Sequence, residues 1–99
     1  VVLFLNNANK INHFETISEG GFTATVADIR VILKKALFHN AIQIILCHNH
    51  PSGNLQPSMA DKELTLKMKE AANYLDIKLL DHIIVSEEGY FSFADEGLL

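Results

Sequence analysis

The chain has 99 residues, 48% of them hydrophobic and 20% charged, which is enough for one domain with its own apolar core. The net charge of −4 argues against direct contact with nucleic acid, because DNA-binding modules gain affinity from basic residues that neutralise phosphates. No apolar run approaches the roughly 20 residues that a membrane span requires. The single cysteine, Cys47, excludes an internal disulfide and suits a reducing cytoplasm, where we expect the protein to act.

The first 18 residues predict a β-hairpin. Residues 1–5 (VVLFL) form a continuous apolar run, and residues 11–17 alternate apolar and polar side chains after an Asn-rich turn. The first residue is not Met and lies inside an apolar run, so we expect a fragment of a longer protein. The exposed edge of residues 1–5 is a candidate surface for pairing with another copy of the chain, which would give a homo-oligomer.

A helix and a central strand follow the hairpin. Thr25 is the expected cap of a helix over residues 25–39, whose apolar side chains recur at three- and four-residue spacing. Asn40 is the expected left-handed stop. Residues 41–47 (AIQIILC) are nearly all apolar, which predicts a central strand covered on both faces.

The second half of the chain predicts a loop, a helix and a closing hairpin. Two prolines and a glycine exclude regular structure from residues 51–57, and Ser58 begins a second amphipathic helix. Residues 77–85 (IKLLDHIIV) predict another strand, interrupted by one polar pair. A tight turn at Glu88 and Gly89 then leads into the last strand.

The order β-β-α-β-α-β-β predicts a single domain over residues 1–99 in the α/β class, with one mixed sheet and a helix packed on each face. Ligands of such sheets bind at strand ends, next to helix N-termini. The segment from His48 to Asp61 joins a strand end to a helix start, so it is the expected site.

The segment also carries three candidate metal ligands. His48 and His50 are two residues apart at the end of an extended strand, so both imidazoles can point the same way toward one ion. The intervening loop returns Asp61 to the same place. Two imidazoles and one carboxylate suit Zn²⁺, and Fe²⁺ shares this preference. Three protein ligands leave one coordination position open, which is typical of catalytic sites.

Helix capping is the competing interpretation of part of this pattern. Ser58 and Asp61 match a variant of the capping box, and the helix dipole favours a carboxylate in the first turn. Capping does not explain two histidines on one face of a strand end. The metal interpretation is therefore favoured.

Three other features invite an interpretation. Cys47 points away from the histidine beside it and is expected to be a buried, inert thiol. Asp81 and His82 interrupt an apolar strand. They either support the site, make a subunit contact, or form a hydrogen-bonded pair near a strand edge. His13 and His39 have no partner at ligand spacing and are expected at the surface.

The stretch HNHPSGNLQPSMAD resembles the JAMM (MPN+) metalloprotease signature: His-x-His-Pro, a spacer, then Ser-x-x-Asp. The whole chain resembles the RadC branch of that superfamily, in VVLFLNN, AIQIILCHNHPSG, LLDHIIV and YFSFADEGLL. The resemblance implies a cytidine-deaminase-like three-layer sandwich and a zinc ion held by His48, His50 and Asp61. It also implies that Ser58 is catalytic, placed near the attacking water and the developing oxyanion.

By the same resemblance the protein is a zinc-dependent hydrolase that cleaves a peptide or isopeptide bond in a peptide or protein substrate. The family's general base is a glutamate just before a strand like residues 1–5, so we expect it upstream of Val1 and assign it to neither Glu15 nor Glu19. Without that base the chain is expected to bind metal and to hydrolyse poorly. The alternative is a DNA-repair-associated interaction module that binds metal without hydrolytic activity, with DNA contacted by an N-terminal helical domain.

Overall fold

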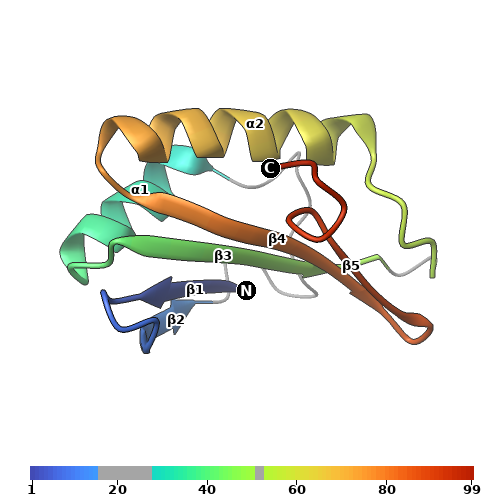
Figure 1. Ribbon diagram of the computed structural model, residues 1–99, viewed down its shortest axis with the longest axis horizontal. Helices are drawn as coiled ribbons and strands as arrows, with labels where there is room; N and C mark the ends of the chain where they lie inside the picture. The colour runs from blue at the N-terminus through green and yellow to red at the C-terminus, as the bar shows by residue number, and fades with distance from the viewer. Residues whose placement is uncertain (16–27, 51–52) are drawn as a thin grey trace.

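The computed structural model describes residues 1–15, 28–50 and 53–99 of the chain. These residues form five strands and two helices in the expected order (Figure 1). The strands and helices are β1 (Val2–Leu5), β2 (Ile11–Glu15), α1 (Ile29–Phe38), β3 (Gln43–Asn49), α2 (Met59–Tyr74), β4 (Lys78–Ser86) and β5 (Gly89–Ser92). Neither helix is long and apolar enough to cross a bilayer.

The strands make one sheet in the order β2-β1-β3-β4-β5. β3 and β4 are parallel, and the other neighbours are antiparallel, so the predicted mixed sheet and both predicted hairpins are confirmed. β3 is the central strand. The prediction that residues 1–5 form an exposed edge is wrong, because β1 is hydrogen-bonded on one side to β2 and on the other to β3.

Both helices have polar caps at their first turn. The expected cap Thr25 lies outside the described residues, and α1 begins instead after Asp28, whose carboxylate accepts the Arg30 backbone N–H at 2.9 Å. Past the other end of α1, Asn40 has a φ of 55°, which confirms the predicted left-handed stop. α2 begins after Ser58, as predicted.

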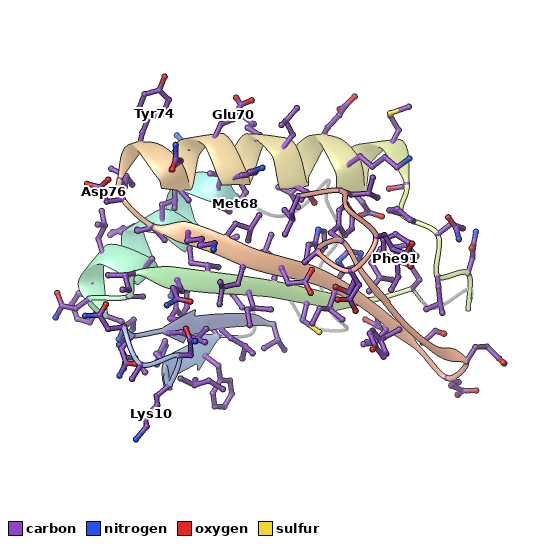
Figure 2. All side chains as sticks on the ribbon, in the orientation of Figure 1. Lys10, Met68, Glu70, Tyr74, Asp76 and Phe91 are labelled. Atoms are coloured by element: carbon purple, nitrogen blue, oxygen red, sulfur yellow. The ribbon has the colours of Figure 1, made fainter. Side chains whose placement is uncertain are left out.

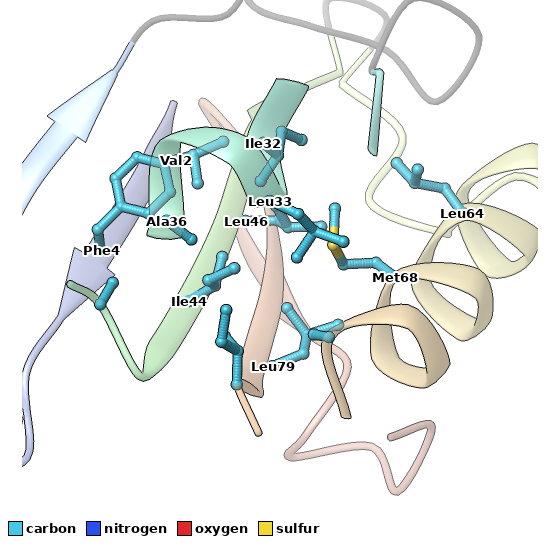
Figure 3. Packing of buried hydrophobic residues seen from close by; sticks show 13 residues of the cluster. Val2, Phe4, Ile32, Leu33, Ala36, Ile44, Leu46, Leu64, Met68 and Leu79 are labelled. Atoms are coloured by element: carbon cyan, nitrogen blue, oxygen red, sulfur yellow. The ribbon is translucent and has the colours of Figure 1, made fainter. Parts of the chain in front are cut away.

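The core lies on one face of the sheet. Val2 pairs with Leu46 and Phe4 pairs with Ile44, so these four buried side chains share a face. Figure 3 shows side chains of both α1 and α2 converging on this cluster. On α2, Met68 points toward the sheet, whereas Glu70 and Tyr74 project away from it (Figure 2).

The expected arrangement with one helix on each face is therefore wrong for these two helices. The physical reason is visible in β3, where burial alternates along the strand: Ile44, Leu46 and His48 are buried, whereas Ile45 and Cys47 on the other face are half-buried. A continuous apolar run predicted two covered faces. The described helices cover only the face that carries Ile44, Leu46 and His48.

β4 contains a bulge that decides which of its side chains face the helices. Ile44 pairs with Leu79, but the next residue, Ile45, pairs with Asp81, so Leu80 is the extra residue. Strand side chains alternate, so without the bulge Leu79 and His82 would point to opposite faces. With it, both are buried on the helix-covered face.

Candidate metal centre

The end of β3 and the start of α2 bring the three predicted ligands together. His48 is the penultimate residue of β3 and is buried under α2. His50 lies one residue beyond the strand, where its backbone N–H still donates to the Val85 carbonyl of β4 at 3.1 Å. Gly53, with a φ of 83°, donates its N–H back to the His50 carbonyl at 3.0 Å, so the chain turns here through a conformation that favours glycine.

The ligand atoms of these residues converge. His48 Nε2 lies 3.4 Å from Asp61 Oδ1, and His50 Nε2 lies 3.2 Å from Asp61 Oδ2. One ligand atom from each of the three side chains falls within 4.8 Å of the others. The histidine rings are tilted by 51° with centroids 5.0 Å apart, so the two side chains approach the carboxylate from different directions.

Asp61 is held in place by the predicted capping box. Its Oδ2 accepts the Ser58 backbone N–H at 2.8 Å, and Ser58 Oγ accepts the Asp61 backbone N–H at 3.0 Å. Burial alone would raise the pKa of Asp61, but the Ser58 backbone and hydroxyl hydrogen bonds, with His48 and His50, lower it below its ordinary value. The carboxylate is thus ionised and held in one orientation. The same side chain caps α2 and faces both histidines, so the two interpretations are compatible.

Each histidine is oriented through its Nδ1 atom. His50 Nδ1 lies 2.7 Å from the Asn54 carbonyl oxygen, and because a carbonyl can only accept, Nδ1 must carry the proton. His48 Nδ1 lies 2.8 Å from His82 Nε2. Burial lowers the pKa of His48, and the nearby His50 lowers it further, against the opposing effect of Asp61.

Two buried residues, His82 and Thr65, lie behind the candidate ligands and are hydrogen-bonded to each other. His82 Nδ1 lies 2.6 Å from Thr65 Oγ1, which also donates to the Asp61 backbone carbonyl at 2.7 Å. Burial lowers the pKa of His82 to about 4, and the neighbouring His48 contributes to this shift. The sequence left several interpretations of His82 open. Its contacts with His48 and Thr65 fit the interpretation in which it supports the site.

The sequence pattern did not single out Thr65. One signal was present: Thr65 is four residues after Asp61, on the same face of the second helix, and a hydroxyl inside an apolar stripe needs a hydrogen-bond partner. Asp81, the other half of the polar pair, does not contact the ligands. Its carboxylate accepts from Ser92 Oγ and from the Ala94 backbone N–H, and so ties β4 to the C-terminal segment.

The remaining predicted residues lie at the margin of the site. Ser58 is exposed at the start of α2, three residues before Asp61. Cys47 is a free thiol on the opposite face of β3 from His48, as expected, but it is half-buried rather than buried.

A second group of ligand-type side chains lies elsewhere. His13 and His39 stack with ring centroids 3.7 Å apart and are half-buried, so the expectation of separate surface residues is wrong. His13 Nε2 lies 3.0 Å from Glu15 Oε1. The Lys35 ammonium lies 2.7 Å from the other oxygen of Glu15, so this carboxylate already has a cation.

A cavity of about 570 Å³ adjoins the candidate metal centre. Its lining comes from the end of β3, the following loop and the β4–β5 turn: Asn49, His50, Gly53, Val85, Ser86, Glu87 and Glu88. A larger cavity of about 760 Å³ lies between the C-terminal half of α2 and the start of β4, and none of the three candidate ligands lines it. Of the three candidate ligands, His50 is the one that lines the smaller cavity.

The fold and the site define a small mixed α/β domain with a two-histidine, one-carboxylate centre at a strand end. The chain belongs to the RadC-like JAB domain family, whose family model matches residues 1–98. This match bears out the resemblance drawn from the HNHP and Ser-x-x-Asp pattern.

Curated relatives agree with the family assignment. The chain is 52% identical over 97 residues to a UPF0758 protein of Flavobacterium johnsoniae and 52% identical over 99 residues to one of Porphyromonas gingivalis. These matches cover 98% and 99% of this chain but 42% and 44% of those relatives. The UPF0758 protein YeeS of Escherichia coli is 44% identical over 98 residues, which cover 99% of this chain and 66% of that protein.

Proposed function

We propose that this domain is a zinc-dependent hydrolase of JAMM type that cleaves a peptide or isopeptide bond. The observation that carries the proposal is the donor set itself. Two imidazoles, one in β3 and one just after it, and one ionised carboxylate in α2 place their ligand atoms close together, and His48 and Asp61 are buried. Membership of the RadC-like JAB domain family supports the same conclusion.

The spacing of these donors fits zinc. Ligand atoms at 2.0–2.1 Å from a tetrahedral ion are about 3.3 Å from one another. The two histidine–carboxylate separations are 3.4 Å to Asp61 Oδ1 and 3.2 Å to Asp61 Oδ2, and one ligand atom from each of the three side chains lies within 4.8 Å of the others. His50 Nδ1 donates to the Asn54 carbonyl, so a neutral His50 ring would offer its Nε2 atom, which lies 3.2 Å from Asp61 Oδ2, to a metal ion.

When bound, zinc supplies Lewis-acid chemistry, which polarises a carbonyl and activates water at neutral pH. The chain's own residues have three further tasks in this proposal. His48, His50 and Asp61 hold the ion, and the cavity beside His50 admits the scissile bond. Ser58, at the start of α2, would stabilise the developing oxyanion.

Metal analysis tests the ligand assignment. The purified protein is expected to hold one zinc per chain, and His50→Ala to lose it. His50 is the least buried of the three ligands, so its removal disturbs the core least. His13→Ala is the matched control, since it removes a histidine from the other cluster and is expected to keep the zinc. Wild-type zinc affinity in His50→Ala would overturn the assignment.

A peptidase assay tests the reaction. This chain spans less than half the length of the Flavobacterium relative, so that full-length protein is assayed beside it. We expect the full-length protein to cleave isopeptide-linked or linear peptides in a zinc-dependent manner. Zinc binding without any cleavage would instead favour the alternative, a metal-binding interaction module.

A further inference from the structure

Two buried side chains, Thr65 and His82, form a continuous hydrogen-bonded relay between two of the candidate ligands, Asp61 and His48. The relay runs from the Asp61 backbone carbonyl to Thr65 Oγ1 (2.7 Å), then to His82 Nδ1 (2.6 Å), and from His82 Nε2 to His48 Nδ1 (2.8 Å). Thr65, His82 and His48 are all at most 3% exposed. The relay therefore starts at one candidate ligand, crosses from α2 to β4, and ends on another candidate ligand in β3.

Only one arrangement of protons satisfies all three contacts when both rings are neutral. The carbonyl of Asp61 can only accept, so the single hydroxyl proton of Thr65 is donated to it. Thr65 Oγ1 must then accept from His82 Nδ1–H. A neutral imidazole carries one proton, so His82 Nε2 is an acceptor and must receive the proton of His48 Nδ1–H. The Nε2 atom of His48 is left with its lone pair.

We propose that Thr65 and His82 are positioning residues that hold His48 in the Nδ1–H tautomer, with its Nε2 lone pair directed at the ion. This inference rests on the proposed zinc site. The opposite polarity would place a proton on His48 Nε2, where it competes with a cation, and would leave the Thr65–Asp61 contact without a proton. Thr65, which is not itself a candidate ligand, thus sets which atom of His48 is available to a metal ion.

The surroundings keep the relay in this geometry. His82 stacks on Phe93 with ring centroids 4.7 Å apart and planes only 6° from parallel, which fixes the rotation of the ring. The bulge at Leu80 turns His82 toward the helix-covered face. Thr65 donates to the carbonyl four residues earlier, which is the ordinary back-bond of a threonine in a helix, and so its oxygen is free to accept.

Thr65→Val tests the relay, because valine keeps the shape of the side chain and removes the hydroxyl. Thr65→Ser is the matched control that restores it. Long-range ¹H–¹⁵N spectra of histidine-labelled, metal-free protein at pH 8 report which ring nitrogen carries the proton. We expect Nδ1–H at both His48 and His82 in the wild type and in Thr65→Ser, and a shift toward Nε2–H in Thr65→Val.

Zinc competition titration of the same three proteins gives the second readout. Loss of a partner behind a ligating histidine typically weakens metal binding by roughly 10–100-fold, so we expect about a tenfold loss in Thr65→Val and none in Thr65→Ser. The proposal is overturned if wild-type His48 carries its proton on Nε2, or if Thr65→Val binds zinc as tightly as Thr65→Ser. If the wild type takes up no zinc, the proposed function fails, and the spectra still decide whether the relay sets the tautomer.

Discussion

Asp61 is both a helix-capping residue and a candidate metal ligand. Its Oδ2 accepts the Ser58 backbone N–H that caps α2, while Oδ1 and Oδ2 face His48 and His50 respectively. An uncharged acceptor is enough for the cap, whereas a carboxylate binds a cation more strongly than a neutral amide does. The two roles can therefore be separated by substitution.

Asp61→Asn keeps an oxygen for the cap and removes the charge. We expect its free energy of unfolding in the absence of metal to stay within about 1 kcal/mol of the wild type, since the cap contact survives. Zinc affinity is expected to fall by at least the roughly 10–100-fold seen for outer contacts, because a ligand itself is lost. Urea unfolding and zinc titration measure the two effects. Glu63→Gln, an exposed change on the same helix, should alter neither.

The buried His82 makes stability depend on pH. Its pKa is 6.5 when the chain is unfolded and about 4 when folded, so between these values the unfolded state binds the additional proton. The free energy of unfolding of the metal-free protein should therefore fall as the pH drops from about 6.5 to about 4, by about 3 kcal/mol from this residue. Urea unfolding at several pH values measures the slope.

His82→Phe provides the comparison for this slope, since a phenyl ring can keep the stack on Phe93 and cannot titrate. The variant should be less stable than the wild type at pH 7, because Thr65 and His48 lose their hydrogen bonds to His82. Its stability should depend less on pH across the same interval. Equal slopes in the two proteins would show that His82 is not the titrating group.

At the scale of the element, α1 and α2 offer matched caps, one beside the candidate site and one remote from it. Ser58→Ala removes the Oγ that accepts the Asp61 N–H, and Asp28→Ala removes the carboxylate that accepts the Arg30 N–H. Each is expected to lower the free energy of unfolding by about 1 kcal/mol. If Ser58 also assists hydrolysis, only Ser58→Ala should reduce turnover beyond what lost stability explains.

The sequence predicted elements better than it predicted which face each side chain occupies. The start of α2 follows from a Pro-rich loop and a serine cap, whereas the apolar run predicted a strand over residues 41–47 and β3 covers Gln43–Asn49. The strand, loop and helix start were still enough to predict that His48, His50 and Asp61 converge. The register of β4 has no such signal. The bulge at Leu80 results from pairing with β3, which is a non-local property, and it is the bulge that brings His82 behind the site.

At the scale of the whole molecule, the side of the sheet on which each helix packs was also hidden in the sequence. An alternating order of strands and helices is compatible with helices on one face or on both. The observed choice has a functional consequence, because α1 and α2 share one core cluster with β1, β3 and β4. α2 thereby carries Asp61 to the same face of the sheet as His48 and His82.

Zinc should therefore stabilise the whole domain, since its candidate ligands come from a strand end and a helix start that are brought together only by folding. A ligand that binds only the folded state adds about 2.7 kcal/mol at a free concentration 100 times its Kd. For a domain of this size each kcal/mol raises the Tm by about 4–8 °C, so zinc should raise it by roughly 10–20 °C. Thermal unfolding with zinc and with a chelator measures the difference. Asp61→Asn should lose the shift, while Glu63→Gln keeps it. Identical melting of the zinc-loaded and chelated wild type would contradict a site that joins β3 to α2.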